Sequence, residues 1–118
     1  MDSLLNRVRV ANPKRNKKNI HRRLLKLGEE YGEVNQAYLA VTSKNNLKQK
    51  TWYDVREELC DVIIVALDIL LTEMPDETFD TLTKDADIEE RSLKEVDRKL
   101  AKWLVKMITK QTDVDDAE

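Results

Sequence analysis

The chain has 118 residues, which is enough for one compact domain and too few for two. Apolar residues make up 41% and charged residues 37%, while Gly and Pro number two each, so the composition favours a helical domain over a many-stranded β fold. No apolar run approaches the roughly 18–20 residues of a membrane helix, and the N-terminus lacks an apolar signal-peptide segment. One cysteine and one histidine argue against a zinc site and against thiol or Ser–His catalysis. We therefore expect a soluble, cytoplasmic protein with no membrane partner.

Charge is distributed unevenly along the chain. Residues 1–28 carry nine Lys and Arg and one acid, a net charge of +8, whereas the remainder carries −10. A basic segment of this kind suits nucleic acid, and it can also attract a small polyanion. Because no aromatic residue lies among these bases and no DNA-binding pattern is present, we favour a solvated helix face and do not expect nucleic acid as the partner.

The first elements in chain order are a basic N-terminal segment and a long helix. Residues 1–18 form either a basic arm or a short helix over 3–10, which Asn12-Pro13 ends. The main all-α domain is expected over 19–111. It begins with a helix over 19–41, because apolar residues recur there at steps of three and four. This apolar stripe consists of Leu24, Leu27, Tyr31, Val34, Tyr38 and Val41.

A polar linker, 43–50, separates that helix from a second helix over 52–72. Thr51 is the expected N-cap, since Asp54 stands at the third helical position. Val62–Leu67 is apolar all round the helix, so we expect it to be covered on both sides, either inside one four-helix unit or by self-association as a homodimer or homotetramer. The apolar stripe of this helix consists of Trp52, Val55, Leu59, Val62, Ala66 and Ile69.

Three further features follow Pro75, which interrupts the helical pattern. A short amphipathic piece carries Phe79 and Leu82, and Ser92–Glu95 is a capping-box pattern that predicts the start of a last helix. The acidic tail, 112–118, is expected to fray. The apolar side of the last helix consists of Leu93, Val96, Leu100, Trp103, Leu104 and Met107.

The two long helices contain a local repeat. A shift of 28 residues places Glu30 on Glu58 and Glu33 on Asp61. Each acidic pair is spaced i, i+3, so it lies on one side of its helix and on the same flank of its apolar stripe. If the two stripes pack antiparallel, the four carboxylates meet at the edge of the core. The same shift superimposes Leu27, Tyr31, Val34, Tyr38 and Val41 on Val55, Leu59, Val62, Ala66 and Ile69.

Four carboxylates in one place repel one another and raise one another's pKa values. The two acidic motifs contain no matching cations, so a divalent ion is the natural counter-charge. Hard oxygen ligands suit Mg²⁺, with Mn²⁺ as the alternative, and protein-bound Mg²⁺ commonly shares its coordination with substrate phosphates. Acidic strings also occur on ordinary solvated faces, but Gly32 inside the first motif calls for close helix approach or for space beside a ligand.

The pattern LLKLGEEYGEVNQAY followed by VREELCDVIIVALDIL resembles the MazG-like family of all-α nucleoside triphosphate pyrophosphatases. The signature of that family is EExxE, a linker and ExxD, and here 24 residues separate Glu33 from Glu58. The resemblance covers residues 20–72 well and the last helix loosely. It implies an oligomeric bundle of four to five helices in each subunit. It also implies Mg²⁺-dependent hydrolysis of an NTP or dNTP to the monophosphate and pyrophosphate.

The resemblance also assigns roles to the acids. By their positions in the family motifs, Glu30, Glu33, Glu58 and Asp61 correspond to the metal ligands. Glu29 corresponds to the remaining acid of the first motif, which either supports a ligand or orients water. All five are therefore the expected catalytic residues.

On the last helix, Lys99 matches a family lysine that is presented to the substrate phosphates, with Lys102 as the second choice. Family members often carry Asn four residues after that lysine, where this chain has Trp103. The usual glycine of the second motif is Cys60 here, which we interpret as a small packing residue and not as a nucleophile.

Residues that contact the base are indicated less directly. Polar and aromatic side chains near the motifs can stack on a base or contact its edge, although core packing is the simpler interpretation of Tyr38 and Trp52. The candidates are Asn35, Tyr38, Trp52 and Tyr53. The linker adds three lysines, which either contact the substrate phosphates or are ordinary surface residues: Lys44, Lys48 and Lys50.

Three alternative functions stay open. A related all-α pyrophosphatase that acts on another nucleotide, such as phosphoribosyl-ATP, would share the fold. A non-catalytic helical protein that binds nucleic acid through the basic N-terminus predicts salt-sensitive affinity that survives loss of the acids. A helical interaction bundle predicts no thermal shift with Mg²⁺ or Mn²⁺. The sequence leaves the base and sugar preference, the number of metal ions, and the choice between dimer and tetramer undecided.

Overall fold

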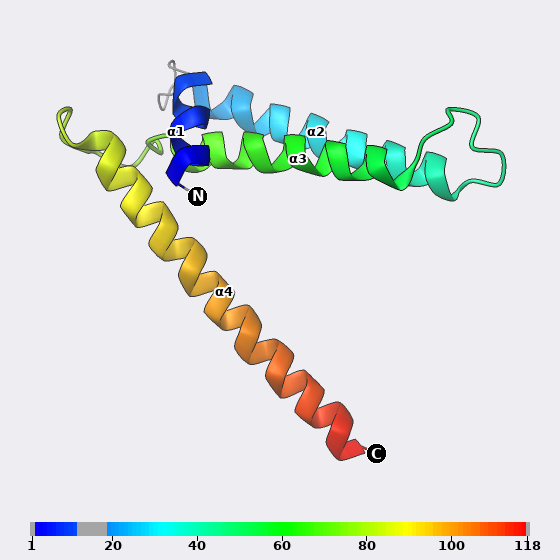
Figure 1. Cartoon of the computed structure of the whole chain (residues 1–118). Helices are drawn as coiled ribbons and strands as arrows, with labels where there is room; N and C mark the ends of the chain where they lie inside the picture. Colours follow the sequence, from blue (N-terminus) through cyan, green and yellow to red (C-terminus); the bar gives the residue numbers. More distant parts are fainter. Residues whose placement is uncertain (1, 12–18, 118) are drawn as a thin grey trace. The chain divides into compact units, whose positions relative to one another are not determined.

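The structure is a computed structural model, and it describes residues 2–11 and 19–117. All regular elements in these two ranges are helices, so the chain is all-α. The segment 12–18, with the expected helix stop at Asn12-Pro13, lies outside the described residues. Figure 1 shows the four helices, which are α1 (Asp2–Ala11), α2 (Ile20–Thr42), α3 (Trp52–Leu70) and α4 (Lys84–Ala117).

The chain divides into two units, Met1–Thr78 and Phe79–Glu118, and each is described by itself. In the first unit, α2 and α3 run side by side as an antiparallel hairpin (Figure 1). Both helices lie within two residues of the predicted bounds. The predicted capping box at Thr51 is confirmed: its Oγ1 accepts a hydrogen bond from the backbone N of Asp54 at 3.4 Å, and its backbone N donates to Asp54 Oδ2 at 2.7 Å.

The loop between α2 and α3 has a specific backbone conformation. Asn46 and Gln49 adopt positive φ angles of 38° and 53°, and Asn is one of the residues that tolerates this region best. The Asn46 side chain closes the loop, because its Nδ2 donates to Lys50 O at 2.7 Å and its Oδ1 accepts from Lys50 N at 3.0 Å. One amide side chain therefore fixes the backbone of Lys50 just before α3 begins.

A small apolar core lies where α1 meets the end of α3. The short helix predicted at the N-terminus is present as α1, and its Leu5 and Val8 are buried with Leu71 and packed against Leu67. This packing anchors α1 to the end of α3 (Figure 1).

The hairpin leaves much of its apolar surface exposed. Within Val62–Leu67, which is predicted to be covered on both sides, Ile63 is 54% and Ile64 48% exposed, so the rest of their unit does not cover them. Three of the six residues of the first predicted apolar stripe and four of the six residues of the second are buried or half-buried. The exposed large side chains of those stripes are Leu24, Tyr31, Tyr38, Trp52 and Leu59.

The last helix begins earlier than predicted. α4 starts at Lys84, so the capping box predicted at Ser92–Glu95 is wrong and both residues lie inside the helix. The chain enters α4 through Thr83, whose backbone O accepts from Asp87 N at 3.0 Å and whose Oγ1 donates to Asp87 Oδ2 at 3.0 Å. A Thr with a hydrogen-bonding acid four residues later thus begins the helix in place of Ser92.

The predicted amphipathic piece before α4 is not helical. Leu82 is in a turn, where its backbone N donates to Asp80 Oδ1 at 3.0 Å, and an aspartate side chain of this kind favours a turn over a helix. Phe79 lies under the Arg91 guanidinium, 5.0 Å from the ring centroid. At the other end, α4 continues through the acidic segment to Ala117, whereas fraying is predicted from 112.

α4 carries the predicted apolar residues at helical spacing, and they are exposed. None of the described helices is long and apolar enough to cross a membrane.

Candidate metal centre

Four carboxylates from α2 and α3 converge at one edge of the hairpin. They belong to Glu30 and Glu33 of α2 and to Glu58 and Asp61 of α3, and one oxygen atom of each lies within 4.8 Å of those of the other three. The convergence predicted from the shared helical phase is therefore confirmed. Glu30 is only 7% exposed and Glu58 is half-buried, whereas Glu33 and Asp61 face solvent.

The cluster carries unbalanced negative charge. Repulsion by Glu30 raises the pKa of Glu33 above its ordinary value, and hydrogen bonding with Glu58 and partial desolvation raise it further. Glu58 Oε2 is buried and has no hydrogen-bond partner in the part of the chain that the structure describes. Because a buried carboxylate oxygen requires a donor or a cation, this atom is the part of the cluster that most favours an ion.

A lysine outside the two motifs supplies one positive charge. Lys26 Nζ lies 3.0 Å from Glu30 Oε1 and 3.8 Å from Glu29 Oε2, and its pKa is raised chiefly by the hydrogen bond and charge of Glu30. The i, i+4 spacing of Lys26 and Glu30 is the sequence signal for this pair. Glu29 is exposed and pairs with Lys26, but it is not one of the four converging acids.

The donor set fits a hard divalent cation. Four carboxylate oxygens match the ligands that Mg²⁺ and Mn²⁺ prefer, whereas zinc sites are usually built from nitrogen and sulfur. Mg²⁺ takes about six ligands, so four protein oxygens leave room for water or phosphate. The fit concerns the chemistry of the residues, and their roles as metal ligands stay predictions.

Of the two explanations for Gly32, close helix approach or space beside a ligand, close helix approach is wrong. Among the residues that the structure describes, a Cβ atom added at Gly32 or at Gly28 would meet nothing within 4 Å. At about 100° per residue, Gly32 lies about 200° round the helix from Glu30, on the side of α2 that turns away from α3. The glycine therefore brings no backbone close to the acids.

A buried ion pair lies next to the cluster along the hairpin. Arg23 Nη1 is 3.6 Å from Asp68 Oδ2 and donates a hydrogen bond to Thr72 Oγ1. All three residues are buried, and Thr72 Oγ1 also donates to Asp68 O at 2.9 Å. This network connects the start of α2 with the end of α3, so it has a structural role, which no periodic pattern in the sequence predicts.

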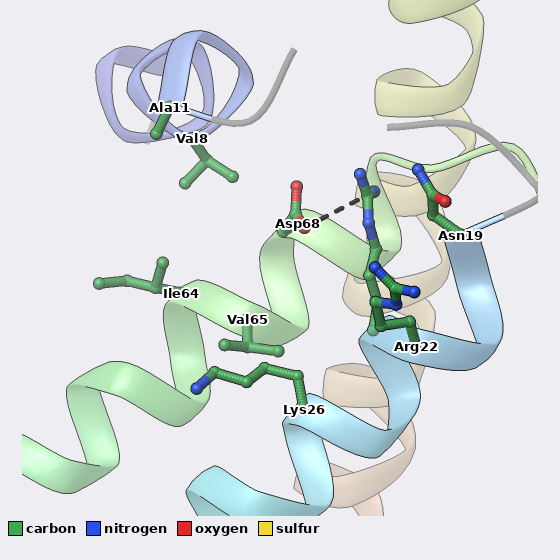
Figure 2. Close-up of a pocket in the computed structure, with 9 residues that line it drawn as sticks. Val8, Ala11, Asn19, Arg22, Lys26, Ile64, Val65 and Asp68 are labelled. Atoms are coloured by element: carbon green, nitrogen blue, oxygen red, sulfur yellow. Dashed lines mark ion pairs between the residues drawn. The ribbon is translucent and has the colours of Figure 1, made fainter. Parts of the chain in front are cut away.

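A cavity of about 620 Å³ lies between α1, α2 and α3, beside this ion pair (Figure 2). Its apolar lining comes from α1 and α3, while α2 contributes cationic side chains; Lys26 reaches from this cavity to Glu30. None of the four converging acids lines it. The lining residues are Val8, Ala11, Asn19, Arg22, Arg23, Lys26, Ile64, Val65 and Asp68.

A second cavity, of about 330 Å³, lies on the other side of the cluster, and we call it the loop cavity. Two of the converging acids, Glu33 and Glu58, form part of its wall. The α2–α3 loop contributes two lysines. The full lining consists of Glu33, Gln36, Ala37, Lys48, Lys50 and Glu58.

The predicted base-contacting residues are exposed and line neither of these two cavities. The rings of Tyr38 and Trp52 are 6.0 Å apart between centroids and tilted by 57°, and both side chains are exposed, so neither is a core residue. At about 100° per residue, Tyr38 lies about 140° round α2 from Glu33 and about 80° from Glu30. Asn35 and Tyr53 are also exposed, and none of the four residues lines either cavity.

The predicted phosphate-contacting lysines of the last helix, Lys99 and Lys102, are exposed on α4 in the second unit. The substrate roles of these lysines and of the aromatic candidates stay predictions. Cys60, expected as a packing residue, is exposed on α3.

Comparison of the chain with protein-family models, curated proteins and solved structures returns no match. The resemblance to MazG-like pyrophosphatases therefore rests on the two acidic motifs and their spacing.

Proposed function

We propose that the chain is a Mg²⁺-dependent nucleoside triphosphate pyrophosphohydrolase of the MazG-like type, which converts an NTP or dNTP to the monophosphate and pyrophosphate. The observation that carries the proposal is the convergence of Glu30, Glu33, Glu58 and Asp61 within 4.8 Å. The buried Glu58 Oε2 without a hydrogen-bond partner among the described residues adds support, because a cation would satisfy it. Mn²⁺ is the alternative cation.

In this proposal, the four converging acids hold the cation. Bound Mg²⁺ supplies charge neutralisation and a water molecule of lowered pKa. Glu30 and Glu58, the less exposed of the four acids, lie on the packed faces of their helices. Repulsion by Glu30 raises the pKa of Glu33, and a bound cation would relieve that repulsion. Glu29, at the exposed edge beside Lys26, is the candidate to orient the attacking water.

The reaction adds one water molecule and breaks one P–O bond. The water oxygen attacks the α-phosphorus, the bond from that phosphorus to the bridging oxygen breaks, and pyrophosphate leaves with the bond electrons, while the proton lost by the attacking water passes to solvent. The chain contributes positioning and charge, which account for most of the rate enhancement in phosphoryl and nucleotidyl transfer.

Self-association is part of the proposal. Ile63 and Ile64 present half of their surfaces on α3, next to exposed Leu59, and a second copy of the hairpin would bury them. We expect a homodimer or homotetramer, measured by light scattering, and we expect Ile63→Lys to shift it toward monomer. A wild-type chain that stays monomeric at high concentration would contradict this part.

The decisive experiment measures pyrophosphate release from each NTP and dNTP with Mg²⁺. Glu58→Gln and Asp61→Asn should each lower turnover by two orders of magnitude or more. This loss corresponds to an increase of about 3 kcal/mol or more in the activation free energy, because each variant lacks one charged metal ligand. Glu57→Gln is the matched control, because Glu57 is an exposed neighbour on α3 outside the cluster. Wild-type turnover in Glu58→Gln would refute the site. Salt-sensitive nucleic-acid binding that persists in that variant, without turnover, would support the non-catalytic alternative.

A further inference from the structure

The α2–α3 loop brings two lysines to the cavity that the acidic cluster opens into. Lys48 and Lys50 line the loop cavity together with Glu33 and Glu58. The larger cavity in Figure 2 is lined by none of the converging acids. A ligand of a cation bound in the cluster would therefore extend into the loop cavity.

The walls of the loop cavity carry opposite charges. Glu33 and Glu58 supply carboxylates on one side, and Lys48 and Lys50 supply ammonium groups from the loop. Among the residues that the structure describes, no ion pair joins either lysine to a carboxylate. A metal-bound polyphosphate has the complementary arrangement, since its cation faces the acids and its remaining oxygens carry excess negative charge.

The backbone that carries Lys50 is held in place before any ligand arrives. Asn46 donates to Lys50 O and accepts from Lys50 N, and it also receives support from Ser43, whose Oγ accepts from Asn46 N at 2.9 Å. A binding group on a pre-ordered loop loses less conformational entropy on binding than one on a flexible loop. The backbone of Lys50 is therefore ordered without a ligand.

We infer that the loop cavity binds the phosphate groups of a metal-bound polyphosphate, with Lys48 and Lys50 as its phosphate-binding residues and Asn46 as the residue that positions Lys50. The inference rests on the proposed function for the identity of the cation and the nucleotide. A volume of about 330 Å³ is at the small end of the roughly 300–1,000 Å³ of small-molecule sites, which suits the phosphate part of a nucleotide. Gln36 adds an amide donor to the same wall.

The test measures the affinity of the full chain for inorganic pyrophosphate at saturating Mg²⁺, by calorimetry, and the affinity for Mn²⁺ alone. Lys48→Gln and Lys50→Gln should each weaken pyrophosphate binding by roughly tenfold, the effect of losing one charged hydrogen bond. Their affinity for Mn²⁺ alone should stay equal to that of the wild type or rise. Lys44→Gln is the control, because Lys44 is exposed on the same loop and does not line the loop cavity.

Each outcome decides between the two claims. The inference is wrong if both lysine variants bind pyrophosphate as tightly as the wild type. It is also wrong if the wild-type chain binds Mn²⁺ but not Mg²⁺–pyrophosphate. Neither result contradicts the metal site. If pyrophosphate binding depends on the lysines but the chain releases no pyrophosphate from any NTP or dNTP, the inference is supported and the proposed function is wrong. A wild-type chain that binds neither Mn²⁺ nor Mg²⁺–pyrophosphate overturns both.

A second variant tests the positioning role of Asn46. Asn46→Gly keeps the backbone compatible with the positive φ of 38° but removes both hydrogen bonds to Lys50. We expect weaker pyrophosphate binding, unchanged affinity for Mn²⁺ alone, and helical content equal to that of the wild type. Unchanged pyrophosphate affinity would show that Asn46 does not position Lys50.

Discussion

Lys26 Nζ lies 3.0 Å from Glu30 Oε1, so the most buried acid of the cluster already has a cation from its own helix. This pair makes Lys26 a competitor of any divalent ion, because both interact with the same carboxylate. Lys26→Met should raise the affinity for Mn²⁺ by roughly two- to fivefold, the range of a partly exposed ion pair. It should also lower the melting temperature of the metal-free protein.

The control for that prediction is Lys94→Met. Lys94 pairs with Glu90 at the same i, i+4 spacing, 3.2 Å apart, on α4. Its loss should leave the Mn²⁺ affinity unchanged. A Mn²⁺ affinity that falls in Lys26→Met would mean that Lys26 supports cation binding.

Removal of one cluster acid should raise the melting temperature of the metal-free protein and reduce the further rise that metal produces. Glu33 is repelled by Glu30, so Glu33→Gln should raise the melting temperature of the metal-free protein by a few degrees. The same variant should lose most of the thermal shift that Mg²⁺ or Mn²⁺ produces in the wild type, because it lacks one anionic ligand. Glu57→Gln should change neither quantity. A metal-induced shift of full size in Glu33→Gln would exclude Glu33 as a ligand.

The N-terminal cap of α3 should make stability depend on pH. Hydrogen bonds from the Thr51 backbone N and hydroxyl lower the pKa of Asp54 below its ordinary value. Because the folded pKa is the lower one, ionised Asp54 stabilises the protein above its ordinary pKa of about 3.8, and this contribution is lost as the pH falls through the folded pKa.

Asp54→Asn should therefore melt at a lower temperature than the wild type at neutral pH, and the two melting temperatures should converge in acid. Asp97→Asn, at an exposed position of α4, is the matched control. A gap between Asp54→Asn and the wild type that stays constant from neutral to acidic pH would disprove the role of the charge.

The glycines of α2 give a test of what covers this face of the helix. Because a Cβ at Gly28 or Gly32 would have no described atom within 4 Å, Gly28→Ala and Gly32→Ala should each stabilise the protein by about 0.5–1 kcal/mol. Urea unfolding measures the change. Destabilisation accompanied by loss of self-association would instead show that a second copy packs against the glycine face.

The features that were predictable from the sequence are those set by local periodicity. The helical phase of Glu30 and Glu58 predicts their convergence, and Thr51 with Asp54 predicts a helix start. The start of α4 was not predictable in this way, because Ser92 and Glu95 fit the interior of a helix as well as a cap. The use of Asn46 to hold Lys50 depends on a loop conformation that leaves no periodic signal. The buried pair of Arg23 and Asp68 depends on helix packing over a long sequence separation.

All four converging acids lie within 32 consecutive residues, on two helices joined by one short loop. Because the hairpin forms from contacts of short sequence separation, we expect it to form early in folding. The repulsion between the four acids therefore arises at that early stage. A divalent cation that relieves this repulsion should accelerate folding as well as slow unfolding.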